Sequence, residues 1–216
     1  MDENLKKQIT SSHGRKILLN FLTEKVKAPE LIDDFDNITN IYLQVNAVVN
    51  ISAIKSIDDI YIKHYLDSIY PYELFTGTVC DVGCGGGFPT LPLALTTKLN
   101  VTGVESVGKK LRLIHRCISE LGIKNVTTEY ARSEELAKNN KSYDTVCARA
   151  LADVDKALAL CAPLTKNGGQ VILYRTQNDE TAKTSTLNKV KMTLSDQIDY
   201  VLPETDIKRR IFVYKK

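Results

Sequence analysis

A glycine-rich stretch that follows a short apolar run carries the strongest chemical signal in the sequence. Residues 81–89 read DVGCGGGFP and lead into an apolar stretch from Leu91 to Leu95, a pattern typical of a strand, a loop and a helix in succession. Glycines allow the backbone to turn tightly and to approach a bound ligand closely. A dinucleotide fingerprint of the form GxGxxG would need a glycine at position 88, where this chain has Phe88. The order GxGxG at residues 83–87 therefore favours a site for another nucleoside-containing cofactor.

Polar residues that follow the next two apolar runs are placed to bind such a nucleoside. Glu105 ends the run that begins at Val101, and a carboxylate there accepts hydrogen bonds from both ribose hydroxyls. Ser133 and Glu134 follow the third run, where they would contact the edge of an adenine. Each has a simpler interpretation: Glu105 is an ordinary acid at a strand end, and Ser133 is the N-cap of a helix with acids in its first turn.

Short apolar runs alternate with amphipathic stretches after Gly77. The predicted strands are Thr78 to Val82, Val101 to Glu105, Val126 to Tyr130, Thr145 to Ala148, Val171 to Tyr174 and Ile211 to Val213. Helices are predicted between most of them, notably Lys109 to Leu121 and Asp153 to Leu164. This alternation indicates βαβ units and an α/β fold of the Rossmann-like type, with a doubly wound and mostly parallel sheet. Such folds bind ligands beyond the carboxyl ends of their strands.

The first third of the chain has no glycine-rich site and a helical pattern. Apolar residues such as Ile17, Leu18 and Phe21 recur at three- and four-residue spacing, with polar residues between them. We expect residues 1–70 to form a helical cap that packs on a core of residues 71–216 as one structural unit.

Composition restricts the partners of the chain without identifying one. A formal net charge of +3 and a pI near 8.5 permit an anionic partner but fall short of a dedicated nucleic-acid-binding domain. The five cysteines include no CxxC pair and the three histidines lack zinc-ligand spacing, so we expect no metal site. Residues 1–15 lack the apolar segment of a signal peptide, and no apolar run approaches the ~20 residues that span a bilayer. We therefore expect a cytoplasmic protein without a membrane partner.

Four blocks of sequence together resemble one family of ribosomal RNA methyltransferases. The blocks are Asn46-x-x-x-Asn50-Ile51-Ser52, Lys63-His64-Tyr65-Leu66-Asp67-Ser68, the stretch from Asp81 to Pro89, and Arg149-Ala150. The glycine stretch resembles motif I of class I methyltransferases, and the set is similar to the glucose-inhibited-division B family from about Asn46 to Val213. The resemblance implies a seven-stranded, S-adenosylmethionine-dependent methyltransferase. Its implied substrate is N7 of a guanosine in 16S ribosomal RNA, either as free RNA or in the small ribosomal subunit.

The same resemblance implies which residues bind the cofactor. They are Asp81, Gly83, Gly85, Gly87, Phe88, Ser133, Glu134 and Arg149, with Glu105 as the ribose acid. One departure follows the fifth predicted strand, where the family often has a lysine and this chain has Arg175. Arginine keeps the positive charge but not the compact ammonium group, so the resemblance does not define how Arg175 contacts the RNA.

Methylation of guanine N7 requires no catalytic base, because the neutral ring already carries a free lone pair at that atom. The site needs only to position two reactants, and orientation alone lowers barriers by roughly 7 to 11 kcal/mol in intramolecular reactions. We expect Arg149 to be the positioning residue, through a hydrogen bond to the cofactor or to a phosphate; the alternative is a surface salt bridge. Cys147 lies in a buried-looking run, which argues against a nucleophilic thiolate. His64 is interpreted as a structural histidine that Asp67 orients from one helical turn away.

Basic residues near the carboxyl end of the second predicted strand are candidates for RNA contact. They are Lys109, Lys110, Arg112 and Arg116 on one predicted helix, with Arg175 and a second cluster of Lys208, Arg209 and Arg210 farther along the chain. Residues at spacings of three and four share a helical face, along which phosphates would lie. The alternative is an ordinary solvated helix face.

Two other functions remain open from the residues alone. A nicotinamide-dependent oxidoreductase also has a strand, a glycine loop and an acidic strand end, although Phe88 disfavours it. A noncatalytic RNA- or protein-binding module on the same scaffold is the second alternative, and the intact glycine loop disfavours that one. We expect the chain to act as a monomer.

Overall fold

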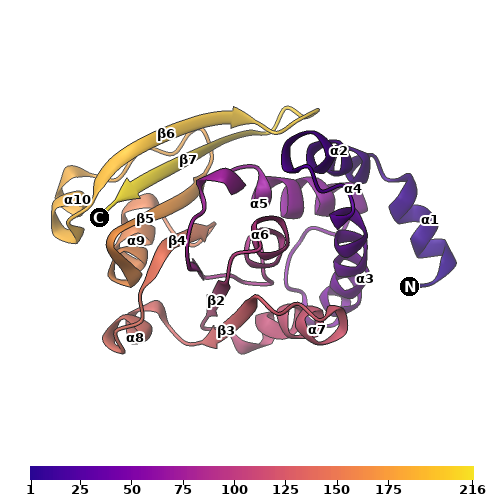
Figure 1. Ribbon diagram of the computed structural model, residues 1–216, viewed down its shortest axis with the longest axis horizontal. Coiled ribbons are helices and arrows are strands. Elements are labelled where there is room, and N and C mark those ends of the chain that lie inside the picture. The colour runs from indigo at the N-terminus through magenta and orange to yellow at the C-terminus, as the bar shows by residue number, and fades with distance from the viewer.

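Seven strands form the sheet at the centre of the computed structural model, which describes residues 1–216 (Figure 1). The strands are β1 (Val79–Val82), β2 (Val101–Glu105), β3 (Val126–Tyr130), β4 (Tyr143–Arg149), β5 (Thr165–Arg175), β6 (Thr193–Val201) and β7 (Lys208–Lys215). Their order across the sheet is β3-β2-β1-β4-β5-β7-β6. Strands β1 to β5 are parallel, and β7 is antiparallel to both of its neighbours. The chain changes direction across the sheet between β1 and β4, where open α/β sheets bind their ligands.

Helices cover both faces of the sheet, and the first of them form a cap beside it (Figure 1). The α-helices are α1 (Glu3–Ser11), α2 (His13–Phe21), α3 (Leu31–Val49), α4 (Ile57–Asp59), α5 (Asp67–Ile69), α6 (Thr90–Thr97), α7 (Arg112–Leu121), α8 (Ser133–Lys138), α9 (Val154–Cys161) and α10 (Thr184–Val190). Two π-helical segments, Leu22–Val26 and Ile60–Leu66, lie within the cap. Short 3₁₀ turns occupy Tyr72–Leu74, Gly108–Leu111 and Ala162–Leu164.

The two faces of the sheet are buried in two separate hydrophobic clusters. Successive side chains of a strand point to opposite faces. In β4, accordingly, Cys147 joins the cluster under α6 and α7, whereas Val146 and Ala148 join the cluster under α8 and α9. Cap residues such as Phe35 and Tyr65 belong to the first of these clusters. The cap therefore shares its core with one face of the sheet.

A buried ion pair ties two helices of the cap to its π-helical segment. The guanidinium of Arg15 lies 2.8 Å from a carboxylate oxygen of Asp36. The hydroxyl of Tyr61, which is fully buried, donates a 2.5 Å hydrogen bond to the other oxygen of Asp36. Charged groups this well covered are stable only when their hydrogen bonds are satisfied, and these are.

The predicted fold class is confirmed, and so is the doubly wound, mostly parallel sheet of seven strands. All six strands located in the sequence are present, although β5 begins earlier, at Thr165, and β7 is longer at both ends. The seventh strand, β6, was not located from sequence. It is an edge strand with eight of its nine residues exposed, so it lacks the alternation of apolar and polar residues that reveals a half-buried strand.

Candidate active site

The glycine loop leaves the carboxyl end of β1 and is fixed at both of its ends. Backbone amides of Gly83 and Cys84 donate to the carbonyl of Val104 at 2.8 and 3.0 Å. The carboxylate of Asp81 accepts hydrogen bonds from the amide and the hydroxyl of Thr90, at 3.2 and 2.6 Å. Because Thr90 begins α6, one buried carboxylate holds the strand and the following helix at a set distance on either side of the loop.

Asp81 itself does not line a pocket. Its side chain is 1% exposed, and its second carboxylate oxygen has no hydrogen-bond partner. Burial raises the pKa of Asp81 to about 6, against the opposing hydrogen bond from Thr90 and the positive charge of Arg149. An unpaired buried oxygen is costly, so it indicates that a donor is missing at this end of the loop.

Two glycines of the loop serve different purposes. Gly87 has a φ of +98°, and a Cβ atom there would lie 2.7 Å from Ile114, so packing against α7 requires glycine. Gly85 has a φ of +55°, and a Cβ atom there would meet nothing within 4 Å. The backbone at Gly85 is thus bare on a side that no protein atom covers, as an approaching ligand requires.

Glu105 is a buried charged group that faces a pocket, with 6% of the residue exposed. One of its carboxylate oxygens accepts from the amide of Gly85 at 3.1 Å and lies 3.8 Å from the ammonium of Lys110. The other oxygen accepts from the amide of Val107 at 2.9 Å. Each oxygen of a carboxylate has two lone pairs, so Glu105 can still accept further hydrogen bonds. The residue is therefore more than an ordinary acid at a strand end, because it also shapes the glycine loop.

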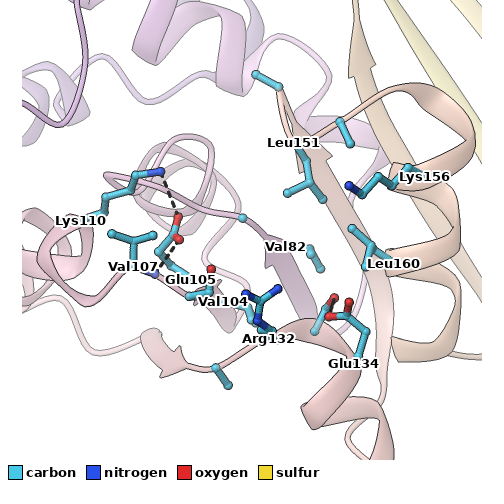
Figure 2. Close-up of a pocket in the computed structure, with 16 residues that line it drawn as sticks. Val82, Val104, Glu105, Val107, Lys110, Arg132, Glu134, Leu151, Lys156 and Leu160 are labelled. Atoms are coloured by element: carbon cyan, nitrogen blue, oxygen red, sulfur yellow. Dashed lines mark hydrogen bonds and ion pairs between the residues drawn. The ribbon is translucent and has the colours of Figure 1, made fainter.

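A pocket of about 460 Å³ opens at the carboxyl ends of β1, β2 and β3. Of the predicted cofactor residues, Gly83, Glu105, Ser133 and Glu134 line it together. Figure 2 shows Glu105 and Lys110 on one side of this pocket and Lys156 and Leu160 of α9 on the other. We call this space the first pocket.

The polar residues at the start of α8 lie in the first pocket as a linked pair. The hydroxyl of Ser133 donates to the carboxylate of Glu134 at 3.2 Å, and Ser133 is 6% exposed. Arg132, not Ser133, occupies the N-cap position, so the interpretation of Ser133 as that N-cap is wrong. Glu134 keeps acceptor capacity toward the pocket, as a contact to an amino group would require.

Besides Asp81 and Arg149, three predicted cofactor residues lie outside the lining of the first pocket. Gly85 and Gly87 belong to the loop that follows Gly83 but do not line the pocket themselves. Phe88 is 7% exposed and packs into the hydrophobic core. The ring of Phe88 stacks on the ring of His64 with a centroid distance of 4.2 Å and an interplanar angle of 9°. Phe88 therefore contacts the cap rather than the pocket.

A second pocket, of about 360 Å³, lies at the carboxyl ends of β4 and β5. Its lining comprises Ile54, Lys63, Asp67, Arg149, Ala150, Tyr174, Arg175, Thr176, Asp179 and Arg209. It shares Ala150 with the first pocket. The two pockets are therefore neighbours, on either side of the residue that follows β4.

Arg149 lies in the second pocket and is bound to the cap. Its guanidinium donates to the carbonyl of Lys63 at 2.8 Å and to the carboxylate of Asp67 at 3.2 Å. Arg209 donates to the other oxygen of Asp67 at 3.0 Å. Asp67 is 5% exposed, so this is a buried ion pair rather than the surface salt bridge considered as the alternative for Arg149.

Arg175 also faces the second pocket. Its terminal nitrogens donate to the carbonyls of Ala152 and Asp153, at 2.5 and 3.3 Å. Its Nε atom is buried and has no partner. The fork of the guanidinium therefore holds the segment between β4 and α9, which a lysine with its single ammonium group could not hold in the same way.

The sequence pattern did not bring Asp67 and Arg209 together. It predicts Asp67 as an orienting partner of His64 and Arg209 as part of a basic cluster for RNA contact. Their positions are 142 residues apart in the chain, and no spacing rule connects them. Only the antiparallel placement of β7 beside β5 brings Arg209 to the cap.

The predicted basic helix residues have different surroundings. Lys110 pairs with Glu105 at the first pocket, whereas Arg116 is held by Glu120 at 2.6 Å and by Gln44 at 3.0 Å. Lys109 and Arg112 are exposed. Arg112 and Arg116 also border a groove of about 350 Å³ between α3 and α7, whose apolar residues include Val48, 78% exposed.

The thiol of Cys147 is not exposed at this edge. Cys147 is fully buried, and burial raises the pKa of its thiol well above the ordinary value. No cluster of three or more His, Cys, Asp or Glu side chains is arranged to hold a metal ion. None of the helices combines the length and the apolar character needed to cross a membrane.

The fold is that of class I S-adenosylmethionine-dependent methyltransferases. Magnesium protoporphyrin IX methyltransferase from Synechocystis PCC 6803, solved with bound SAH, has the same fold, with a TM-score of 0.55 at 17% identity over 83% of this chain and 99% of that one. A second methyltransferase, which acts on 1,6-didemethyltoxoflavin in Burkholderia thailandensis, gives a TM-score of 0.51 at 16% identity over 70% of this chain and 76% of that one.

Sequence comparison then identifies the family. The family model described as rRNA small subunit methyltransferase G matches residues 31–212. Relatives named ribosomal RNA small subunit methyltransferase G include one from Lactobacillus johnsonii, 33% identical over 187 residues, 81% of this chain and 78% of the relative. One from Staphylococcus aureus is 34% identical over 185 residues, 79% of this chain and 76% of the relative. The chain belongs to the rRNA small subunit methyltransferase G family, which confirms the resemblance, and its cofactor is S-adenosylmethionine.

The bare backbone at Gly85 leads to a prediction about cofactor binding. We expect Gly85→Val to abolish binding of S-adenosylhomocysteine, because its side chain would enter the space that the ligand needs. Isothermal titration calorimetry measures the affinity. Gly122→Val is a matched control, because Gly122 also has a positive φ, of +66°, and open space around its Cβ position, but ends α7 away from both pockets.

Both valine substitutions should cost about 1 to 2 kcal/mol of stability, because a β-branched residue is strained in the left-handed region. Only Gly85→Val should lose the cofactor. Unchanged affinity in a folded Gly85→Val protein would show that the ligand does not approach this part of the loop.

Proposed function

We propose that this protein transfers a methyl group from S-adenosylmethionine to N7 of a guanosine in 16S ribosomal RNA. Membership in the family over residues 31–212 supports the RNA substrate. The assignment of N7 as the acceptor is supported by a cationic pocket that lies beside the cofactor pocket. No side chain in this cationic pocket is free to remove a proton from the acceptor. N7 of guanine carries a free lone pair, so it can be methylated without removal of a proton.

The first pocket fits the nucleoside part of the cofactor. Glu105 has acceptor capacity for the ribose hydroxyls, and Ser133 with Glu134 would contact the adenine. The loop from Gly83 to Gly87 would hold the amino-acid part of the cofactor. The unpaired oxygen of Asp81, next to this loop, can accept a further hydrogen bond. Bound S-adenosylmethionine supplies an electrophilic methyl group on a positively charged sulfur.

The second pocket is the proposed site of the guanosine. Because the second pocket adjoins the first pocket at Ala150, an acceptor bound there would lie next to the methyl group. Lys63, Arg149, Arg175 and Arg209 give it a positive lining, which attracts the phosphates on either side of a nucleotide. Arg149 is the residue that we propose to position the acceptor, because it lies at the end of β4 beside Ala150.

Both carboxylates of the second pocket accept hydrogen bonds from the protein. Asp67 is bound by two arginines, and Asp179 accepts 2.8 Å hydrogen bonds from the amide and the hydroxyl of Thr176. Burial by itself would raise the pKa of Asp179. The hydrogen bonds from Thr176 act in the opposite direction, and the pKa is lowered overall. A carboxylate held in this way is a poor base, which supports a reaction without proton removal, such as methylation of N7.

The face formed by the 3₁₀ turn Gly108–Leu111 and α7, which begins at Lys109, is the proposed docking surface for RNA. Lys109 and Arg112 are exposed and available for phosphate contact, and the helix starts beside Glu105 at the methyl-transfer edge. Arg116 would have to leave Glu120 and Gln44 to contact RNA, so we assign it a smaller contribution. The family's substrate also supports action in the cytoplasm on the RNA or the small subunit, and we propose that a monomer suffices.

One assay tests the proposed reaction directly. Incubation of the protein and labelled S-adenosylmethionine with small subunits that lack the modification should transfer one methyl group to a guanosine. Cleavage at 7-methylguanosine then locates the nucleotide. Transfer to another atom would refute the N7 assignment, and no transfer to naked RNA or subunits would favour the noncatalytic alternative.

A second prediction separates positioning by Arg149 from nucleophilic catalysis by Cys147. Arg149→Ala should lower kcat/KM at least tenfold, about 1.4 kcal/mol, because a charged hydrogen bond at the strand end is lost. Cys147→Ser should have a much smaller effect, because that thiol is buried and protonated. Steady-state kinetics measure both variants, and circular dichroism verifies folding. Equal losses in two folded variants would contradict the exclusion of a thiolate.

A third prediction concerns the docking surface. Neutralisation of Lys109, Arg112 and Arg116 together should leave cofactor affinity unchanged and weaken RNA binding. The slope of log affinity against log salt should flatten by up to ~0.9 for each lost contact to a duplex phosphate. Filter binding over a salt series measures this slope. Wild-type affinity and slope in the triple variant would exclude this face as the docking surface.

A further inference from the structure

His64 is buried between the glycine loop and the second pocket, and methyl transfer as proposed above does not use it. The side chain is 5% exposed and comes from the π-helical segment Ile60–Leu66 of the cap. One face of its ring stacks on Phe88, the residue that follows the last glycine of the loop. Its two nitrogens face different elements, so the ring has a partner on each of three sides.

A continuous hydrogen-bond chain passes through this ring. A terminal nitrogen of Arg149 lies 3.4 Å from Nδ1 of His64, and Nε2 lies 3.3 Å from the hydroxyl of Tyr42. The hydroxyl of Tyr42 donates a 2.6 Å hydrogen bond to the carbonyl of Ile54. The chain thus joins the end of β4 to the segment after α3.

The donors and acceptors of this chain determine the protonation state of His64. Arg149 can only donate, so Nδ1 must accept. The hydroxyl proton of Tyr42 is used on Ile54, so its oxygen accepts from Nε2 of His64. Burial and the neighbouring positive charge of Arg149 lower the pKa of His64 to about 3, which agrees with a neutral ring protonated on Nε2.

Both ends of the chain line the second pocket. Arg149 lines it from the end of β4, and Ile54 lines it from the segment that follows α3. The same segment is held by Asn46, which exchanges two 3.0 Å hydrogen bonds with the backbone of Ser52. We propose that His64 is a positioning residue that fixes the distance between these two parts of the pocket lining, and thereby the place where the guanosine is held. This proposal rests on the assignment of the second pocket as the acceptor site.

The contact with Phe88 extends the same positioning to the cofactor loop. A methyl group and its acceptor must meet within a small distance and angle, and misplacement by about 1 Å can lower the rate on the order of a hundredfold. His64 touches the loop through its ring face and the acceptor pocket through its ring nitrogens. One side chain therefore aligns the two sites relative to each other.

Two variants remove links of the chain while keeping the packing. Tyr42→Phe removes the hydroxyl between His64 and Ile54, and His64→Phe keeps a flat ring on Phe88 without its nitrogens. Each should lower kcat/KM for the RNA about tenfold with unchanged cofactor affinity, because the acceptor is misplaced while the first pocket is intact. The double variant should be no worse than the poorer single variant, because either change breaks the same chain.

Tyr61→Phe is the matched control, because it removes a buried tyrosine hydroxyl from the same cap, where the partner is Asp36. Tyr61→Phe should lower the melting temperature about as much as Tyr42→Phe does, and it should leave kcat/KM for the RNA unchanged. Independent, additive effects of Tyr42→Phe and His64→Phe, or an equal loss of kcat/KM in Tyr61→Phe, would overturn the proposal.

Nitrogen NMR of the wild-type protein tests the chain without RNA. We expect the resonances of a neutral His64 that carries its proton on Nε2 near neutral pH, and loss of that single tautomer in Tyr42→Phe. A charged ring or a proton on Nδ1 would overturn the chain even if methyl transfer is observed. Failure of the wild-type protein to methylate the RNA, with the expected tautomer present, would instead refute the proposed function.

Discussion

The site depends on one buried carboxylate, that of Asp67, which joins the helical cap to the sheet. It receives Arg149 from the end of β4 and Arg209 from the start of β7. Two cations around one anion compensate the loss of hydration that burial imposes, and the carbonyl of Lys63 accepts a further hydrogen bond from Arg149. Without this carboxylate, two guanidinium groups would face each other at the edge where the guanosine is proposed to bind. The cap therefore lines the second pocket and is not only a cover over one face of the sheet.

A second carboxylate has the corresponding role at the glycine loop. Glu105 accepts from the amides of Gly85 and Val107, so the loop after β1 and the turn after β2 are fixed to the same group. Asp81 anchors the other side of the loop through Thr90. Preorganised backbone of this kind binds a ligand without a large loss of conformational entropy on binding.

The elements that follow local rules were predictable from sequence, whereas the contacts between distant elements were not. The strand, glycine loop and helix at residues 79–97 and the alternation of strands with helices are local patterns, and the structure confirms both. The exposed edge strand Thr193–Val201 was missed because neither of its faces is consistently buried. The stacking of Phe88 on His64 and the pairing of Asp67 with Arg209 depend on how the cap packs on the sheet, which no periodicity in the chain encodes.

The protonation states around the second pocket follow from burial and favour a reaction that moves no proton from the acceptor. Burial and the charge of Arg149 keep His64 neutral. Both of its ring nitrogens are engaged in hydrogen bonds, with Arg149 and Tyr42. Asp67 and Asp179 are occupied by donors, and the thiol of Cys147 stays protonated. A reaction that needed a base would require one of these groups to be released, at the cost of the contacts that shape the pocket. Transfer of a methyl group to a nitrogen with a free lone pair leaves every one of those contacts in place, which is why this geometry and this chemistry suit each other.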